Sequence, residues 1–487
     1  MQKHVTDYVL YRWRYAFGYT FAILLIGILL TIASLYVPGG LREAEMQSSI
    51  QSGSLSIESI EPHMVIDLPY HIMQRIGFNL FGISTFTIKL PSIILGTLTC
   101  VGVFLLTRTW FRRNVAILAT ILAVTTTHFL FLSQDGTPGI MYSFLAIWIL
   151  FTATYVTRNK LFGTLWKVLA GVFMATILYT PFGIYLVIAV MTTAFFHPHI
   201  RYIITRFNRP RLALAVALGL ISITPLIYAS IVDQTTLFTL LGIPTGDISL
   251  KENVVKTLTD VFGFMGTSND ATLRPLYSLG VVLLAAVGMY KLLTYKYTAR
   301  SYITLTWGLL TVPLILLNPE RITYIFPLVI LMLALGIATL ITDWYKLFPR
   351  NPYARIAGLI PLTILVLGLV ASGVVRYMYN YQHNPEVLSH YSHDLRLLDE
   401  ELGESYANPK STRVVVTSSE LGFYNLVAHY DERFAASTDI VNAPVNVIYS
   451  RQAYIANKPA VDKVDRIITN WRATDGDRFY IYKTAAK

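Results

Sequence analysis

The sequence predicts an all-α polytopic membrane bundle of about 11 transmembrane helices, followed by a small C-terminal α/β domain. Long stretches such as 17–37, 90–107 and 356–375 carry no charged residue. Hydrophobic residues make up 54% of the chain and charged residues only 14%, with a mean hydropathy of +0.52. Because backbone N–H and C=O groups in hydrocarbon must be bonded within their own segment, stretches of about 20 apolar residues become spanning helices.

The predicted spans follow one another with short polar connectors. Residues 168–196 are compatible with one long span or with two, and the Tyr-Thr-Pro-Phe-Gly turn at 179–183 favours two. Losing one crossing would invert the topology of everything that follows. The predicted spans are 17–37, 90–107, 115–132, 138–156, 168–179, 182–196, 212–232, 276–290, 302–317, 322–341 and 356–375.

The net charge of +11 is explained by where the basic residues lie. Lysine and arginine concentrate in alternate connectors, as at 108–113 and 201–211. By the positive-inside rule, these connectors are cytoplasmic, which places the N-terminus inside and the C-terminal domain outside. We therefore expect a multi-pass protein of the cell membrane surrounded by lipid, and no nucleic-acid partner.

Two domains are predicted. Residues 1–377 form the transmembrane domain, with long external loops at 38–89 and 233–275, and residues 378–487 form the external α/β domain. The loops are amphipathic, which indicates short helices along the membrane interface.

The external domain is predicted from an abrupt rise in charge after residue 375. Strands are expected at 413–417, 445–449 and 479–483, and helices at 385–402 and 419–430. On a helix, His390, His393 and Asp394 would share one face. This spacing is compatible with metal ligands, but a solvated helix face is the favoured interpretation.

Acidic side chains that can perform chemistry stand in two of the external connections. Glu43 and Glu45 follow the first span, and either carboxylate can act as a general base. On a helix they point about 200° apart, so one of them faces a given cavity. The alternative is an ordinary charged interfacial loop. Asp135 is the only charge in the turn 133–137, where it either takes part in a site or starts the next helix.

Arg321 follows Asn318-Pro319-Glu320 in another tight external turn. Its planar guanidinium is suited to bind two phosphate oxygens at once. Alternatively, Arg321 pairs with Glu320 or reaches the lipid headgroups.

The order of these motifs resembles the GT-C superfamily of membrane glycosyltransferases, especially the protein O-mannosyltransferase and aminoarabinose transferase branch. The resemblance covers residues 1–160, and beyond them it is mainly architectural. The motifs that carry it are Arg42-Glu43-Ala44, Leu68-Pro69-Tyr70-His71, Leu80-Phe81-Gly82, Lys89-Leu90-Pro91-Ser92 and Ser133-Gln134-Asp135.

The resemblance implies transfer of a sugar from a polyprenyl-phosphate donor to an acceptor at the extracytoplasmic face, with inversion at the anomeric carbon. Glu43 is then expected to be the catalytic base or its helper, with Glu45 as the alternative, and Asp135 to orient the acceptor or a metal. Arg321, with Lys89, is expected to stabilise the departing phosphate. The resemblance leaves the need for a divalent metal open, and the acceptor, whether protein, lipid or glycan, is not identified.

Arg42 departs from the family pattern, which has an acidic residue at this position. Either Glu43 or Glu45 takes over as the base, or the protein binds without catalysing; Arg42 itself could instead join the phosphate site. The sequence thus leaves two further functions open besides the glycosyltransferase. One is a non-catalytic glycolipid-binding or envelope-assembly protein, and the less favoured one is a transporter or flippase, which would need ionisable residues deep within its spans.

Overall fold

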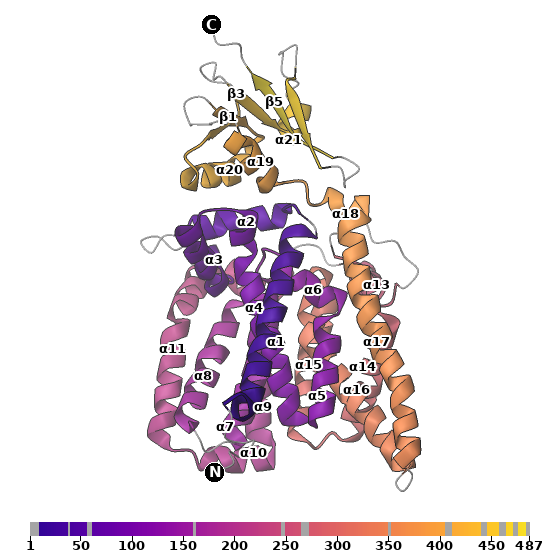
Figure 1. Cartoon of the computed structure of the whole chain (residues 1–487). Helices are drawn as coiled ribbons and strands as arrows, with labels where there is room; N and C mark the ends of the chain where they lie inside the picture. Colours follow the sequence, from indigo (N-terminus) through magenta and orange to yellow (C-terminus); the bar gives the residue numbers. More distant parts are fainter. Residues whose placement is uncertain are drawn as a thin grey trace, which may run out of the picture.

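The computed structural model is a bundle of long helices whose one end carries short helices and a C-terminal domain (Figure 1). Helix α1 (Val9–Tyr36) begins at the opposite end of the bundle. The structure describes residues 9–37, 39–55, 61–158, 162–244, 249–263, 272–348, 352–404, 412–439, 446–456, 464–470 and 476–483.

All eleven predicted apolar stretches fall largely on helices of the bundle. Among the described residues, six helices are long and apolar enough to cross a membrane, or up to eight if two bent pairs each count as one span. Three more apolar helices are shorter, so the predicted count of about 11 crossings is not confirmed. After α1, the bundle contains α4 (Thr85–Trp110), α5 (Arg113–Val124), α6 (Thr127–Gln134), α7 (Gly139–Arg158), α8 (Gly163–Thr176), α9 (Gly183–Phe196), α10 (Pro198–Thr205), α11 (Arg209–Val232), α14 (Leu279–Thr294), α15 (Ala299–Leu317), α16 (Phe326–Leu347) and α17 (Pro352–His383).

The predicted turn within 168–196 is confirmed. Helix α8 passes into the short 3-10 helix η3 (Ile177–Tyr179), and α9 begins only at Gly183. A Cβ atom at Gly183 would lie 1.8 Å from the Ile177 carbonyl oxygen, so only glycine allows the chain to turn back this closely. The stretch is therefore two helices.

A bend of 65° separates α5 from α6. The Thr126 hydroxyl accepts a hydrogen bond from the Phe129 N–H, which caps α6 after the break. Helix α17 packs against the bend, where the Thr127 hydroxyl donates to the Gly373 carbonyl at 3.1 Å. The bend fixes the direction of α6, and α6 ends at the turn that holds Asp135.

Short helices occupy both predicted external loops. The helices of the first loop lie across the end of the bundle, between the long helices and the C-terminal domain (Figure 1). The first loop contains α2 (Glu43–Gly53), the 3-10 helix η2 (Pro62–Val65) and α3 (Leu68–Phe81), and the second contains α12 (Gln234–Leu241) and α13 (Leu250–Phe262); a further 3-10 helix, η4 (Pro319–Ile325), precedes α16.

The C-terminal domain is α/β, as predicted, and α17 continues to His383, past the predicted boundary after 377. In the described part of this domain, a sheet of five strands has the order β2-β1-β3-β5-β4. Strand β1 pairs in parallel with β2 and β3, and β5 pairs antiparallel with β3 and β4. The elements are α18 (Pro385–Ser389), α19 (Leu395–Glu404), β1 (Thr412–Val415), α20 (Ser418–Tyr430), β2 (Ala435–Ser437), β3 (Asn446–Ser450), α21 (Arg451–Ala456), β4 (Arg466–Thr469) and β5 (Asp477–Lys483).

The predicted single helix at 385–402 is wrong, because the segment splits into α18 and α19. Between them the chain turns back to the bundle, where Leu41 and His393 form an isolated β-bridge. The Leu41 N–H donates to the His393 carbonyl at 2.6 Å. This pairing with the start of α2 replaces the helical hydrogen bonds that the local sequence would otherwise form.

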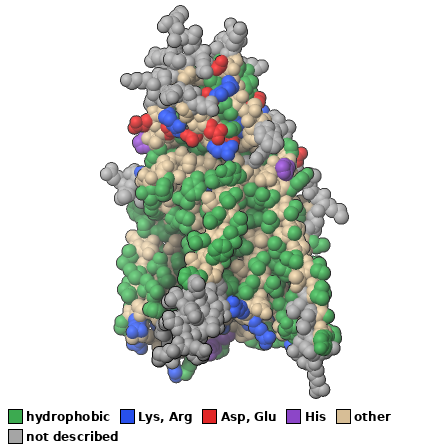
Figure 2. All heavy atoms as spheres, viewed as in Figure 1, with side chains coloured by type: hydrophobic (Ala, Val, Ile, Leu, Met, Phe, Trp, Pro, Cys, Tyr) green, Lys and Arg blue, Asp and Glu red, His purple; other side chains and the backbone are tan. Residues whose placement is uncertain are grey.

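The C-terminal domain shares a hydrophobic core with the short helices beneath it. Leu41, Met46 and Phe78 pack in one cluster with Val414 and Phe423 of the domain. Figure 2 shows hydrophobic side chains over the flank of the bundle, basic side chains near its far end, and acidic and basic side chains gathered where the domain meets the bundle. The candidate functional site lies at this junction.

Candidate functional site

Glu45 is buried at the first turn of α2, with no exposed surface. One carboxylate oxygen accepts the Arg42 N–H at 2.8 Å, which forms a capping box, and the other accepts the Gly136 N–H at 2.7 Å. Burial raises the pKa of Glu45, while the positive charges of Lys89 and Arg42 oppose that shift. Glu45 thus fastens α2 to the turn after α6.

Arg42 and Asp135 form an ion pair beside Glu45. The Arg42 Nη2 atom lies 2.5 Å from Asp135 Oδ1, and the Thr137 hydroxyl donates to Asp135 Oδ2 at 2.5 Å. Burial lowers the pKa of Arg42, but the attractions of Asp135, Tyr391 and Glu45 together outweigh this effect and leave the pKa raised. Arg42 therefore remains charged, and its charge neutralises Asp135.

Lys89 completes this group from α4. Its Nζ lies 3.7 Å from Glu45 Oε1 and donates to the carbonyls of Ser34 at 3.4 Å and Gly40 at 3.3 Å. The side chain has no exposed surface. We call Arg42, Glu45, Lys89 and Asp135 the charge cluster; its two positive and two negative side chains balance.

Glu43 does not join the charge cluster. It is exposed on α2, and its charge acts on His393 of the C-terminal segment. The prediction that only one of the two glutamates faces inward is confirmed, and that residue is Glu45.

Arg321 stands with Asp67 rather than with the charge cluster. Its main electrostatic partners are Tyr324, Asp67 and the neighbouring Glu320. Asp67 precedes α3 in a left-handed conformation (φ 53°), is 5% exposed, and has an Oδ1 atom with no hydrogen-bond partner among the described residues. Left-handed backbone at a non-glycine residue and an unbonded buried carboxylate oxygen are both typical of functional sites.

Burial raises the pKa of Asp67 to about 7, although the charge of Arg321 pulls it downward. The carboxyl group therefore exchanges its proton near neutral pH. Sequence reasoning missed Asp67, because one aspartate before a Leu-Pro helix start looks like an ordinary cap. Only the folded structure distinguishes Asp67 from an ordinary capping residue. Its N–H donates to the Tyr179 carbonyl at 2.9 Å, and the charge of Arg321 from η4 acts on its carboxylate.

Tyr70 is within electrostatic range of both charged groups. It is fully buried on α3, and its hydroxyl shares a 2.8 Å hydrogen bond with Ser92. Burial raises its pKa, and the negative charges of Asp135, Glu45 and Asp67 add to the shift. Tyr70 is therefore influenced by both groups, and it belongs to α3, the helix that follows Asp67.

Gln74 connects α2, α3 and the Asp135 turn. Its amide nitrogen donates to the Ile88 carbonyl at 2.8 Å and the Gly136 carbonyl at 3.3 Å. Its oxygen accepts from Ser52 of α2 at 2.6 Å. This buried network holds α3, and with it Asp67, in a fixed position relative to the charge cluster.

Three buried tyrosines adjoin the charge cluster: Tyr377 and Tyr381 of α17, and Tyr391 after α18. The negative charge of Asp135 interacts electrostatically with the hydroxyl groups of all three tyrosines. The hydroxyls of Tyr377 and Tyr391 have no hydrogen-bond partner among the described residues. Aromatic faces with free hydroxyls suit a polar ligand with apolar surfaces.

The possible metal site at His390, His393 and Asp394 is not supported. These residues lie at the break between α18 and α19, so the helical face that would have grouped them does not form. Within the described part of the chain, no group of three or more histidine, cysteine, aspartate or glutamate side chains is placed to hold a metal ion.

Taken together, the apolar bundle, the short helices at one end with their charged groups, and the C-terminal domain define a polytopic membrane protein that carries a small α/β domain at one end. Residues 69–228 match the family model described as dolichyl-phosphate-mannose-protein mannosyltransferase. This match and the fold confirm the resemblance to GT-C glycosyltransferases that the motifs predicted.

Two solved proteins are similar to this chain at low sequence identity. ArnT from Cupriavidus metallidurans, bound to undecaprenyl phosphate, has a TM-score of 0.50 and 14% identity over 95% of this chain and 97% of ArnT. Its apo state gives the same TM-score and identity over 96% and 98%. The Archaeoglobus fulgidus oligosaccharyltransferase in complex with zinc and sulfate has a TM-score of 0.46 and 13% identity, over 88% of this chain and 68% of that protein. A comparison with curated protein sequences gave no match.

Proposed function

We propose that the protein is a membrane glycosyltransferase that moves a sugar from a polyprenyl-phosphate donor to an acceptor at the end of the bundle that bears the C-terminal domain. The family match over residues 69–228 supports the reaction class. The undecaprenyl phosphate bound by ArnT, which shares the fold, supports the donor class. The predicted topology makes this end extracytoplasmic.

The observation that carries the proposal is the Asp67–Arg321 pair. A general base near neutral pH needs a pKa close to the working pH, and the Asp67 pKa is about 7. Its Oδ1 atom has no hydrogen-bond partner among the described residues, so an acceptor hydroxyl can donate to it. Arg321, beside it, supplies a guanidinium fork for the phosphate.

The reaction then proceeds as a displacement at the anomeric carbon. The acceptor oxygen attacks that carbon and gives its proton to Asp67. The bond between the anomeric carbon and the phosphate oxygen breaks, and polyprenyl phosphate leaves with the electron pair. Arg321 stabilises the negative charge on the leaving phosphate, and the configuration at the carbon inverts.

The charge cluster has a positioning role in this proposal. Both oxygens of Glu45 and both of Asp135 already accept hydrogen bonds from the protein, so neither carboxylate is free to take a proton. Arg42 and Lys89 are occupied with these carboxylates. The roles first predicted for Glu43, Glu45 and Asp135 in catalysis, and for Lys89 and Arg42 at the phosphate, remain alternative predictions.

The test is release of polyprenyl phosphate from a polyprenyl-phosphate sugar by the purified full chain. We expect Asp67→Asn to lower the rate at least 100-fold, as loss of a general base does, while the protein still folds. Glu61→Gln is the control, because Glu61 is an exposed acidic residue in the same loop, 64% exposed. An Asp67→Asn rate equal to that of Glu61→Gln would refute the assignment of Asp67.

A second function is favoured by one observation: Arg42 occupies the position where the family has an acidic residue, and it pairs with Asp135. On this reading the protein binds a glycolipid donor without turnover. Retention of a polyprenyl-phosphate sugar by the unmodified protein, with no release of polyprenyl phosphate for any acceptor class, would support this alternative and reject the enzyme.

A further inference from the structure

A cavity lies at the end of the bundle opposite the C-terminal domain. Its main chamber has a volume of about 880 Å³ and lies where α4, α14, α15 and α16 meet. It extends into a smaller space of about 240 Å³ that shares Trp110, Lys291 and Arg300. This cavity is separate from the charge cluster and from the Asp67–Arg321 pair.

Basic side chains dominate the polar part of this cavity. Arg112, Lys291, Arg300 and Lys346 line it, and no carboxylate is among its described lining residues. Lys346 pairs with Asp343 at 3.3 Å outside the cavity. The remaining positive charge has no counter-charge within the wall, which favours an anionic ligand.

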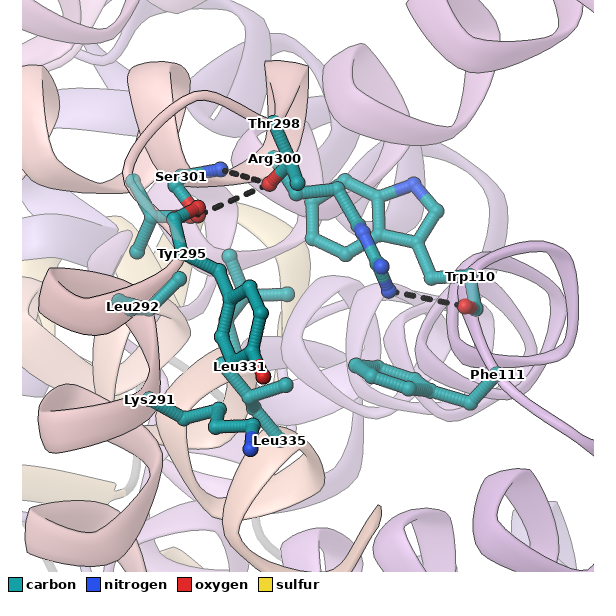
Figure 3. A pocket seen from close by; sticks show the side chains of 11 residues that line it. Trp110, Phe111, Lys291, Leu292, Tyr295, Thr298, Arg300, Ser301, Leu331 and Leu335 are labelled. Carbon is teal, nitrogen blue, oxygen red and sulfur yellow. Dashed lines mark hydrogen bonds between the residues drawn. The ribbon is translucent and has the colours of Figure 1, made fainter. Parts of the chain in front are cut away.

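Aromatic rings and a backbone carbonyl hold two of these cations in place. The Arg300 guanidinium donates to the Trp110 carbonyl at 2.9 Å, and its Cζ atom lies over the Phe111 ring at 5.2 Å from the ring centroid. Lys291 lies 4.6 Å from the centroid of the Tyr295 ring. Figure 3 shows Lys291 and Tyr295 on one side of the pocket and Trp110 and Phe111 across from them. The positive end of the cavity is thus built from fixed side chains.

The rest of the wall combines hydroxyl side chains, such as Ser301 and Thr342, with a continuous set of apolar side chains. Leu331 and Leu335 of α16 and Leu292 of α14 line the smaller space, and Ala338 and Ile341 line the main chamber. A ligand that fits both parts carries a negative head and an apolar chain. Since the cavity lies between helices of a membrane bundle, a lipid can reach it from the bilayer.

We propose that this cavity binds an anionic phospholipid, with the phosphate against Lys291 and Arg300 and the first part of a chain along α16. A phosphate diester offers oxygens to the guanidinium fork of Arg300 and a point charge to Lys291. Free phosphate would leave the apolar wall unfilled. The assignment does not depend on the proposed transfer reaction, because it uses other residues at the other end of the bundle.

The experiment is native mass spectrometry of the purified full chain with phosphatidylglycerol, and with phosphatidylcholine for comparison. We expect phosphatidylglycerol to bind preferentially. Lys291→Gln should weaken its binding about 5-fold and Lys291→Glu about 30-fold, because one and then two unit charges are lost near the phosphate. Lys296→Glu is the matched control, since Lys296 is an exposed lysine five residues away that does not line the cavity.

Three outcomes would overturn the proposal. The first is equal binding of phosphatidylcholine and phosphatidylglycerol. The second is an equal effect of Lys291→Glu and Lys296→Glu. The third is displacement of the lipid by inorganic phosphate at the same concentration as the lipid, which would show an anion site without a lipid chain. The graded Gln and Glu variants at Lys291 keep the test valid if one of them folds poorly.

Discussion

The Arg42 guanidinium lies 2.5 Å from the Asp135 carboxylate, joining residues 93 positions apart at the start of α2 and the end of α6. Their side chains are 16% and 4% exposed. Because the pair is largely buried, removing one partner leaves the other charge without compensation. The position at which the sequence departs from the family pattern is therefore occupied by a structural ion pair.

A double-mutant cycle should reveal this coupling. We expect Arg42→Ala and Asp135→Asn each to destabilise the protein by about 3 kcal/mol, because each leaves a buried charge unpaired. The double variant should lose clearly less than the sum of the two. Thermal unfolding in detergent measures the three values, and strictly additive losses would contradict the pair.

The two glutamates of α2 should differ sharply in their effect on stability. Both carboxylate oxygens of Glu45 accept a backbone N–H, and Glu45→Gln replaces one of these oxygens with an NH2 group that cannot accept. We expect this change to lower the free energy of unfolding by about 2 kcal/mol. Glu43→Gln changes an exposed side chain and should stay within about 0.5 kcal/mol. Unfolding midpoints of the two variants provide the comparison, and equal midpoints would refute the different placement of Glu43 and Glu45.

Asp67 should make the stability fall as the pH rises. Its pKa in the folded protein is about 7, above the ordinary aspartate value of about 3.9 in the unfolded chain, so the folded state holds the proton more tightly. This contribution is fully present below pH ~4, declines between pH ~4 and ~7, and is lost above, with an upper limit on the order of 4 kcal/mol. Unfolding midpoints at pH 5 and pH 8 should differ more for the unmodified protein than for Asp67→Asn. An equal difference in both proteins would show that Asp67 does not titrate in this range.

The absence of a side chain at Gly40 should be required for the close contact between the start of α2 and the segment 391–393. A Cβ atom at Gly40 would lie 2.6 Å from the Tyr391 carbonyl oxygen, so Gly40→Ala must displace the segment that pairs Leu41 with His393. We expect faster hydrogen exchange at the Leu41 amide, by about 10-fold or more. Gly403→Ala is the control, because nothing lies within 4 Å of a Cβ atom there. Unchanged exchange in Gly40→Ala would contradict the close approach.

The sequence predicted the helices well because lipid imposes one strong rule, that apolar stretches must be helical. The turn before Gly183 and the helix 419–430 were also predicted correctly, since proline, glycine and a capping residue mark them locally. The number of membrane crossings could not be predicted from the apolar stretches alone. Packing decides where a helix bends, as between α5 and α6, and where it ends early, as in α14. The edge strands β2 and β4 have only three and four residues, too few for a clear alternating pattern.

The candidate site was predicted in part. The motif order identified Arg42, Glu45, Lys89 and Asp135, which the structure brings together. The partner of Arg321 could not be found from the sequence, because Asp67 becomes distinctive only through its burial, its left-handed backbone and its approach to η4. Likewise, the break between α18 and α19 follows from pairing with Leu41, which is distant in the chain.

The pH dependence of polyprenyl-phosphate release tests the proposed catalytic site most directly. With Asp67 as the base, kcat/KM for a polyprenyl-phosphate sugar should rise with pH through an apparent pKa of about 7 and level off above it. Asp67→Asn should remove both this rise and at least 99% of the rate, while Glu61→Gln keeps both. A rise that persists unchanged in Asp67→Asn would contradict the account.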